Sequence, residues 1–210
     1  MIKILIADDH AIVRKGLKQI VAETSDMVVA DEASNGHEVI NKASKNDYDV
    51  VVLDITMPGI SGLDTLKQLR IHKPKLPILV LSMHPEEQYA VRVLKAGASG
   101  YLTKGSAPNE LIRAIRKVSL DRKYISPFLA EKLAFDLEAD NGRPLHETLS
   151  DREYQVICMI ASGKTVKEIA EESFLSVKTI STYRSRILEK MNMKSNAELT
   201  HYAIKNELVE

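Results

Sequence analysis

Residues 50–59, Val-Val-Val-Leu-Asp-Ile-Thr-Met-Pro-Gly, decide the fold of this chain. Four apolar residues, three of them β-branched, run directly into Asp54. A short unbroken apolar run suits a strand buried on both faces of a parallel sheet, and Pro58 and Gly59 mark the turn after it. Asp54 is thus expected at the carboxyl end of a central strand, the edge where open α/β sheets bind ligands. A carboxylate there serves as a metal ligand, as a nucleophile, or only as a turn-forming cap.

The composition limits the class of protein. A chain of 210 residues with 44% hydrophobic residues has one or two domains and enough apolar side chains for a core. Lys+Arg and Asp+Glu both number 29, so nucleic-acid binding would require a local basic patch. A single cysteine, Cys158, excludes an internal disulfide framework, and its apolar neighbours predict a core thiol. We expect a cytoplasmic protein, because neither a signal peptide nor an apolar stretch of about 20 residues is visible.

The first half of the chain alternates short apolar segments with amphipathic ones. Strands are predicted over 2–7, 27–33, 48–53, 77–81 and 99–102, and helices over 11–23, 37–44, 62–70, 86–96 and 109–118. This alternation predicts one doubly wound, five-stranded parallel sheet with helices on both faces.

Polar residues follow four of these strands, and all should meet at the carboxyl edge. They are Asp8 and Asp9, Asp54, Ser82, and Lys104. If Asp54 accepts a phosphoryl group, Asp9 and Asp54 would hold a hard divalent cation, most simply Mg²⁺, with Asp8 adding charge. Lys104 would pair with a phosphoryl oxygen and Ser82 would donate to another. Each residue alone also has an ordinary interpretation, as a helix cap, a solvated loop lysine or a strand-end hydroxyl.

Residues 1–120 resemble the receiver domain of two-component response regulators. The resemblance is carried by the Asp8-Asp9 pair and by "LDITMPG", "LSM" and "GYLTKG" at the family's intervals. It implies a flavodoxin-like fold, for which the receiver is itself a standard example. It also implies that a sensor histidine kinase transfers a phosphoryl group to Asp54.

The same resemblance assigns further roles. Asp8, Asp9 and the backbone carbonyl of Thr56 would serve the Mg²⁺ site with Asp54. Ser82 and Tyr101 would form a switch pair, in which the hydroxyl moves to the phosphoryl group and the ring follows inward. Thr56 and His84 would flank the phosphoryl group.

Residues 121–147 are predicted to be a linker. Apolar residues at helical spacing predict a short helix over 128–137. The polar segment 140–144 contains a glycine and a proline and is the best candidate for a domain boundary.

Residues 148–210 show helical patterns throughout. A capping box of Ser150 and Glu153 begins a helix that runs to Gly163, and further helices are predicted over 166–172, 177–191 and 196–205. The two middle helices, joined by a tight turn, indicate a helix-turn-helix. In the longer one, an apolar stripe should face the core: Val177, Ile180, Ile187, Leu188 and Met191.

The opposite face of this longer helix carries short hydroxyls and cations, the side chains that contact bases and phosphates in a major groove. A solvated amphipathic helix would have a similar composition, and the helix-turn-helix context favours DNA. Residues 149–199 resemble the LuxR-type DNA-binding domain, and a receiver followed by this domain defines the NarL/FixJ group. By position, Ser181, Thr182 and Ser185 would face base edges. Phosphate or supporting contacts would come from Lys178, Thr179, Tyr183 and Arg186.

The leading hypothesis is a response-regulator transcription factor whose phosphorylation at Asp54 controls dimerisation and binding to double-stranded promoter DNA. The resemblance implies a homodimer, at least in the phosphorylated or DNA-bound state, with residues 197–203 in the contact. The only chemistry expected is Mg²⁺-dependent self-phosphorylation and autodephosphorylation, and no membrane partner is expected. A phosphatase of the aspartyl-phosphate kind is disfavoured because Thr56 stands where its general acid would be. A third class, an interaction module that never touches DNA, stays open.

Overall fold

The structure is a computed structural model that describes residues 1–131 and 144–209. Internal contacts divide the chain into two units, Met1–Ala134 and Phe135–Glu210. Each unit has its own buried apolar core.

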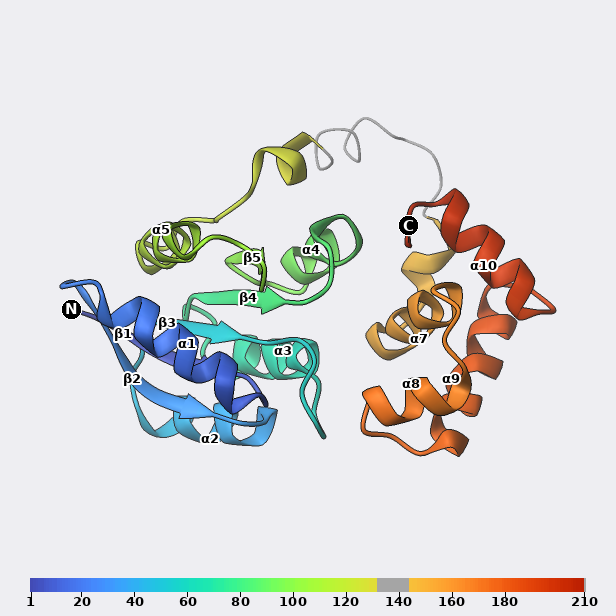
Figure 1. Cartoon of the computed structure of the whole chain (residues 1–210), viewed down its shortest axis with the longest axis horizontal. Helices are drawn as coiled ribbons and strands as arrows, with labels where there is room; N and C mark the ends of the chain where they lie inside the picture. Colours follow the sequence, from blue (N-terminus) through green and yellow to red (C-terminus); the bar gives the residue numbers. More distant parts are fainter. Residues whose placement is uncertain (132–143, 210) are drawn as a thin grey trace. The chain divides into compact units, whose positions relative to one another are not determined.

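The first unit is the predicted five-stranded parallel sheet (Figure 1). Its strands are β1 (Ile2–Ala7), β2 (Met27–Ala33), β3 (Val50–Leu53), β4 (Ile78–Ser82) and β5 (Gly100–Thr103), in the order β2-β1-β3-β4-β5. Its helices are α1 (Ala11–Ala22), α2 (Gly36–Lys45), α3 (Gly62–His72), α4 (Glu86–Lys95) and α5 (Pro108–Ser119). The flavodoxin-like fold expected from the sequence is confirmed.

The central strand β3 is buried on both faces, as its sequence predicts. Val50 and Val52 pack in a core cluster with residues of α1 and α5. Val51 and Leu53 point to the opposite face, because successive side chains alternate along a strand. The register pairs Leu53 with Ala7 of β1 and Val80 of β4, so the residues after all three strands emerge at one edge.

Two details of this unit differ from the sequence prediction. The third strand begins at Val50 rather than at residue 48. Ile12, counted in the apolar stripe of α1, is 81% exposed, whereas Leu17 and Val21 are buried. The neighbouring Val13 packs against the core, so the first turn of α1 partly buries Val13 and leaves Ile12 exposed, and spacing alone does not reveal this.

The start of the predicted linker is attached to the first unit. Tyr124 forms a parallel bridge with Gly100, and its N–H donates to the carbonyl of Ser99 at 2.8 Å. Ser126 Oγ donates to Glu86 Oε1 of α4 at 2.7 Å, and Leu129 is fully buried. Helical structure begins at residue 127, so the described part of the predicted 128–137 helix is present. The remainder of that helix, and most of the polar segment 140–144, lie outside the described residues.

The second unit is helical. A short 3₁₀ helix, η1 (Leu145–Thr148), was not predicted; it precedes α7 (Asp151–Ala161), α8 (Val166–Glu172), α9 (Val177–Lys190) and α10 (Asn196–Lys205). The predicted capping box of Ser150 and Glu153 is confirmed, and Thr165 and Glu168 form a second one at α8. Cys158 is buried, as expected. In α9, Ile180, Ile187 and the following Met191 are buried, but Val177 in the first turn is 51% exposed, contrary to its assignment to the core stripe.

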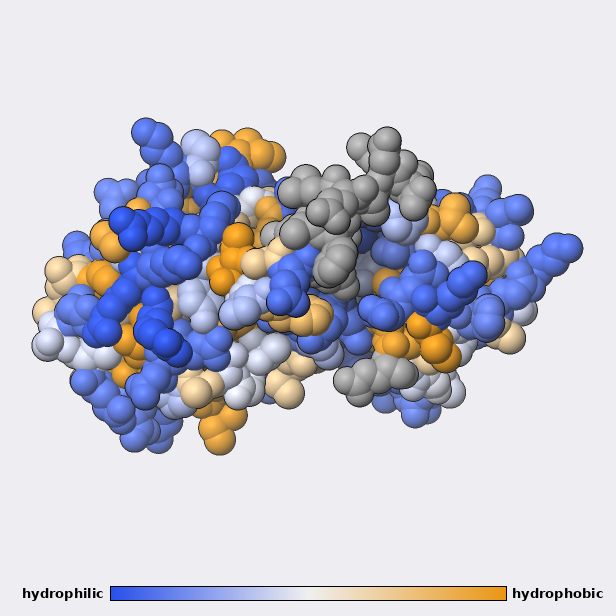
Figure 2. Space-filling model, turned by 90° about the horizontal axis from the view of Figure 1, so that it is seen from above, coloured by the Kyte–Doolittle hydropathy of each residue, from blue (hydrophilic) through white to orange (hydrophobic). Residues whose placement is uncertain are grey.

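The face seen in Figure 2 is mostly hydrophilic, with apolar side chains in scattered patches. Such scattered patches are normal for a globular protein and do not themselves mark a binding site. Among the helices of the described residues, none combines the length and the apolar character needed to cross a membrane.

Candidate functional site: the acidic edge of the sheet

Residues from three strand ends meet through one ammonium group. Lys104 Nζ lies 2.7 Å from Asp8 Oδ2 and 2.9 Å from Asp54 Oδ2. Both carboxylates are almost completely buried, and the Lys104 side chain is 10% exposed. The backbone fixes this arrangement, because the Asp54 N–H donates to Ala7 O at 2.9 Å and extends the pairing of β3 with β1 past the strand end. The convergence predicted from the strand order is therefore present.

The surroundings of Asp54 disfavour the ionised form of its carboxyl group. Burial, aided by the negative charge of Asp8, raises the pKa of Asp54 to about 6 although Lys104 opposes the shift. Burial acts to lower the pKa of Lys104, but the two carboxylates outweigh it and the net shift is upward. The lysine therefore stays protonated at neutral pH, while ionised Asp54 is held at a cost in free energy.

The residues fit a hard divalent cation. Asp54 Oδ1 is buried and has no hydrogen-bond partner among the described residues. Asp8, Asp9 and His10 each offer a ligand atom, and these atoms lie within 4.8 Å of one another. Asp8 and Asp54 share the single Lys104 ammonium and Asp9 lies beside His10, so negative charge is left for a cation to neutralise. Carboxylate oxygens are the ligands that Mg²⁺ prefers.

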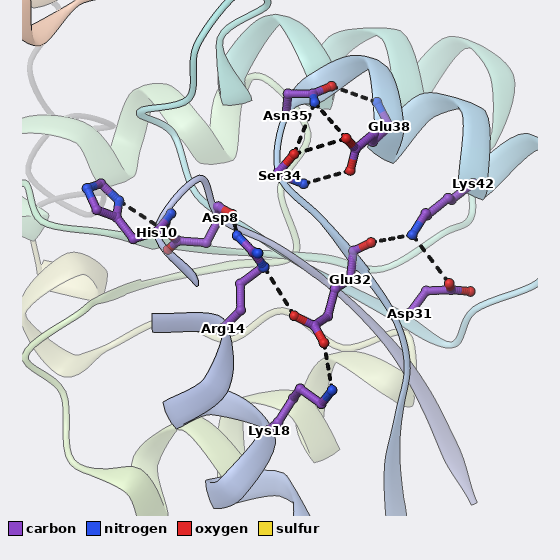
Figure 3. A network of polar contacts seen from close by, with 10 residues as sticks. All are labelled: Asp8, His10, Arg14, Lys18, Asp31, Glu32, Ser34, Asn35, Glu38 and Lys42. Atoms are coloured by element: carbon purple, nitrogen blue, oxygen red, sulfur yellow. Dashed lines mark hydrogen bonds and ion pairs between the residues drawn. The ribbon is translucent and has the colours of Figure 1, made fainter. Parts of the chain in front are cut away.

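Two residues beside this cluster were missed by the sequence reasoning. The imidazole of His10 lies with its Nδ1 2.8 Å from Asp9 Oδ1. Arg14 donates through Nη1 to the backbone carbonyl of Asp8 at 2.7 Å and through Nε to Glu32 Oε2 at 3.1 Å (Figure 3). Arg14 thus ties α1 and β2 to the turn that carries the acids. The sequence signal was weak, since a polar residue in the first turn of an amphipathic helix is ordinary.

The alternative in which Asp8 or Asp9 caps α1 is not what the structure shows. The N-cap residue of α1 is His10, with no side-chain capping bond. Asp8 Oδ1 instead accepts from the backbone N–H of His10 at 2.8 Å, which orients the carboxylate inside the turn.

Gly62 is the third residue that was missed. A Cβ at Gly62 would lie 1.9 Å from the backbone oxygen of Asp54 and 2.6 Å from the Cα of Ile55. Helix α3 therefore packs directly on the peptide that carries Asp54, an approach that only glycine permits. The signal available in the sequence was a glycine in the first turn of the helix that follows the Asp54 turn.

The predicted switch residues lie on β4 and β5. Ser82 is fully buried and its Oγ accepts from the backbone N–H of His84 at 3.1 Å. The N–H of Lys104 donates to Ser82 O at 2.7 Å, which joins the two strand ends. Tyr101 is 1% exposed and its hydroxyl donates to His84 O at 2.7 Å, so its ring already lies inward. Burial raises the pKa of Tyr101, and the hydroxyl stays protonated.

Thr56 and His84, which were expected to flank the phosphoryl group, are both half-buried. Thr56 is half-buried two residues after Asp54, and its backbone N–H lowers the pKa of the Asp54 carboxyl. His84 stacks on Tyr89 with ring centroids 4.4 Å apart.

The α9 helix presents the predicted polar face to solvent. Five of the seven predicted DNA-contacting residues are exposed: Lys178, Ser181, Thr182, Ser185 and Arg186. Thr179 and Tyr183 are half-buried, which suits supporting positions. The hydroxyls of Thr182 and Ser185 donate to carbonyls one turn earlier, at 3.0 and 3.1 Å.

Contacts to the neighbouring helices hold α9 in position. Lys190 Nζ lies 2.6 Å from Glu153 Oε2, and the same Glu153 carboxylate closes the capping box of α7. Arg184 donates to Asn196 Oδ1 at 2.6 Å, which joins α9 to the start of α10. The exposed face is therefore carried on a helix fixed from two sides.

Two family models match this arrangement of a sheet with an acidic edge and a helical unit with an exposed polar helix. Residues 4–116 match the response regulator receiver domain, and residues 147–203 match the bacterial regulatory proteins of the luxR family. The response regulator UvrY of Escherichia coli K12 is 38% identical over 209 residues, covering 99% of this chain and 96% of UvrY. This chain is a two-component response regulator of the LuxR family.

Solved structures agree with the family assignment. The response regulator resembles RcsB from Salmonella enterica serovar Typhimurium bound to promoter rprA in the presence of phosphomimetic BeF₃⁻, with a TM-score of 0.66 and 28% identity over 96% of this chain and 97% of RcsB. It also resembles RcsB in a structure of two dimers bound to two parallel DNAs, with a TM-score of 0.59 and 27% identity over 100% of this chain and 99% of that one. The response regulator is accordingly a DNA-binding transcription factor.

Proposed function

We propose that a sensor histidine kinase phosphorylates this response regulator on Asp54 and that the modification controls its binding to promoter DNA. The observation that carries the proposal is the state of the Asp54 carboxylate. Oδ2 is held by Lys104 at 2.9 Å, whereas Oδ1 is buried without a hydrogen-bond partner among the described residues. A carboxylate that is held through one oxygen, with the other oxygen buried and without a hydrogen bond, suits a nucleophile better than a turn-forming cap.

In the proposed transfer, an Asp54 carboxylate oxygen forms a bond to the phosphorus of a phosphohistidine or a small acyl phosphate. The bond from phosphorus to the donor nitrogen or oxygen breaks, and the leaving group takes that electron pair. Asp8, Asp9, Asp54 and the backbone carbonyl of Thr56 would hold Mg²⁺, which when bound offsets the repulsion between the phosphoryl group and the carboxylate. Lys104, already beside both buried acids, would pair with a phosphoryl oxygen.

The response to the phosphoryl group is assigned to Ser82 and Tyr101. The Ser82 hydroxyl would donate to a phosphoryl oxygen. The Tyr101 ring lies inward and its hydroxyl donates to His84 O. Tyr101 would therefore hold the loop after β4 in a conformation in which Ser82 can move to the phosphoryl group. The net result is a shift between two states of the first unit.

The phosphorylation step is tested with acetyl phosphate and Mg²⁺ on the full chain, followed by intact mass spectrometry. Wild type should gain the mass of one phosphoryl group, and Asp54→Asn should gain none. Asp47→Asn is the matched control, because the Asp47 side chain is 98% exposed. Equal labelling of Asp54→Asn and wild type would show that another residue accepts the group.

The second unit is proposed to bind double-stranded promoter DNA through α9 as a homodimer. Ser181, Thr182 and Ser185 would contact base edges, and the remaining contacts, mostly to phosphates, would come from Lys178, Thr179, Tyr183 and Arg186. Support comes from the exposure of this face and from the relative RcsB, whose structures include promoter-bound and dimeric forms.

The dimer contact is proposed on α10. Of the 197–203 segment expected from the sequence, Ala203 is fully buried, so it serves the core of its own unit. Ala197, His201 and Ile204 are exposed and recur at helical spacing, which makes one continuous face. Ile204 is 54% exposed and is the apolar residue best placed to be covered by a second copy.

Binding-site selection on random duplexes, with and without acetyl phosphate, tests the DNA proposal. Arg186→Gln should weaken binding to all sequences and lower the slope of log affinity against log salt by about 1, since one phosphate contact is lost. Ser181→Ala should instead change the selected sequence. Ile204→Glu should leave binding to a single half-site intact and abolish cooperative binding to paired half-sites. Failure to enrich any sequence would favour an interaction module without DNA binding.

The proposed organisation is a receiver over 1–120, a linker over 121–147 and a DNA-binding domain over 148–210. The division at residues 134 and 135 falls inside this linker. The proposed site of action is the cytoplasm, where promoter DNA is accessible.

A further inference from the structure

A cationic pocket lies at the amino edge of the sheet, away from the strand ends that carry the acids. Its walls come from the end of α3, the loop before β5 and the segment after α5. The cavity has a volume of about 240 Å³. In the described part of the chain its lining includes four cations, Arg70, Lys75, Arg122 and Lys123, and a single acid, Asp121. The pocket shares no residue with the Asp54 site, so a ligand proposed here does not rest on the proposed phosphorylation.

Arg70 is held in the wall by neutral partners. Its Nε donates to Gly97 O at 2.7 Å, and its Nη1 donates to Pro74 O at 2.9 Å and to Leu76 O at 2.7 Å. Among the described residues, no carboxylate forms an ion pair with it and its Nη2 has no hydrogen-bond partner. Burial lowers the pKa of Arg70, which shows that its charge is partly desolvated.

The close approach of Arg70 depends on Gly97. This glycine has φ +106°, and a Cβ there would lie 3.0 Å from Arg70 Cγ and 3.1 Å from Arg70 Nε. The backbone thus leaves room for the guanidinium stem at this position.

Lys123 is an exposed residue that supplies a second cation held by a backbone carbonyl. Its Nζ donates to Ala98 O at 2.6 Å, and no described carboxylate forms an ion pair with it. Burial and the charge of Arg70 together lower the pKa of Lys123. Two like charges therefore face one cavity with only partial compensation from Asp121.

A group of surface cations is ordinarily solvated and needs no ligand. Here, however, Arg70 and Lys123 are held by backbone carbonyls and line one cavity, so their positive charges are kept close together at a cost that a bound anion would relieve. The volume is below the roughly 300–1,000 Å³ of pockets that enclose drug-sized molecules, so the anion is small or is the end of a larger molecule. Three excess positive charges match an anion that carries two or more negative charges.

We propose that this pocket binds a diphosphate group. Arg70 would donate to it through Nη2. The ammonium groups of Lys75 and Lys123 and the guanidinium of Arg122 would add positive charge around it. The group could come from free inorganic diphosphate or from a nucleoside diphosphate, because both present the same chemistry to the pocket.

The test uses ¹⁵N-labelled full-length protein in EDTA, titrated separately with inorganic pyrophosphate and with ADP. EDTA removes divalent cations that would carry pyrophosphate to the acidic edge. Saturable shifts of the Gly97, Ala98 and Ser99 amides are expected. If ADP binds more tightly than pyrophosphate, the source is a nucleotide; if pyrophosphate binds more tightly, it is the free anion.

Variants separate this pocket from other cations. Arg122→Gln with Lys123→Gln should weaken pyrophosphate binding by about ten-fold or more, since two charged contacts are lost. Lys15→Gln, an exposed lysine on α1, and Arg186→Gln, on the DNA-binding face, should leave it unchanged. Far-UV circular dichroism checks that each variant is folded.

Three results would overturn the proposal. The first is no saturable shift in this loop up to about 5 mM pyrophosphate, the range of weak binding. The second is wild-type affinity in the double variant. The third is equal weakening by Lys15→Gln or Arg186→Gln, which would mean that the anion follows overall charge rather than this pocket.

Discussion

Replacing Asp54 by asparagine should stabilise the metal-free protein, although it removes the proposed phosphoryl acceptor. The pKa of Asp54 rises from 3.8 to about 6 in the folded state. Each unit corresponds to about 1.4 kcal/mol, so ionised Asp54 costs the folded state about 3 kcal/mol at pH 7.5. Asparagine is neutral and similar in shape, and should recover about 2–3 kcal/mol of that cost.

The pH dependence is set by the direction of the shift. Because the pKa is higher in the folded state, protonation of Asp54 favours folding below pH 3.8 and this advantage is lost as the pH rises through about 6. The gain from Asp54→Asn should therefore be largest above pH 7 and fall to about 1 kcal/mol at pH 4.5.

The assay is urea unfolding in EDTA, followed by pulsed hydrogen exchange and mass spectrometry of peptides from β1 and β3. These peptides report the first unit alone in a chain of two units. Asp47→Asn should change stability by less than about 0.5 kcal/mol, because Asp47 is 98% exposed. Adding Mg²⁺ should stabilise wild type more than Asp54→Asn. The reasoning is refuted if Asp54→Asn is no more stable than wild type at pH 7.5, or if its gain does not shrink at pH 4.5.

Three further changes test the packing and the ion pairs. Gly62→Ala should destabilise the first unit by about 1–3 kcal/mol and slow acetyl-phosphate labelling, because the new Cβ would lie 1.9 Å from the Asp54 backbone oxygen; wild-type labelling would contradict this close approach. Lys104→Met leaves two buried carboxylates without their cation and should cost about 3–5 kcal/mol at pH 7.5 in thermal unfolding, with recovery at lower pH as the acids protonate; a loss independent of pH would contradict the electrostatic origin. Glu153→Gln removes a carboxylate whose pKa is lowered, since Lys190 and the helix cap outweigh its burial. Its cost should be about 1 kcal/mol at neutral pH and should vanish as the pH falls below 4.5, measured by urea unfolding with peptides of α7; the same cost at pH 3 would exclude the ion pair as the cause.

Local sequence determined the order of elements, the parallel sheet and the edge at which the acids meet. A buried parallel strand must be apolar at every position, and the strand connections place the carboxyl ends of all strands together. The placement of Asp8, Asp54 and Lys104 follows from these constraints without knowledge of any side-chain contact. Helix starts such as Ser150 were also predictable, because a capping box is completed within four residues of sequence.

Only the tertiary structure decided which atoms are paired and which are left free. Lys104 and Asp54 are 50 residues apart, and their 2.9 Å contact depends on the register of three strands, β3, β4 and β5. The same is true of the approach of Gly62 to the Asp54 backbone and of Arg14 to the Asp8 carbonyl. Spacing shows which face a residue occupies, but distances between segments come from packing. This is also why Ile12 and Val177, both apolar and in first helical turns, are exposed: spacing did not show which side chain of the turn meets the core, as Val13 does beside Ile12.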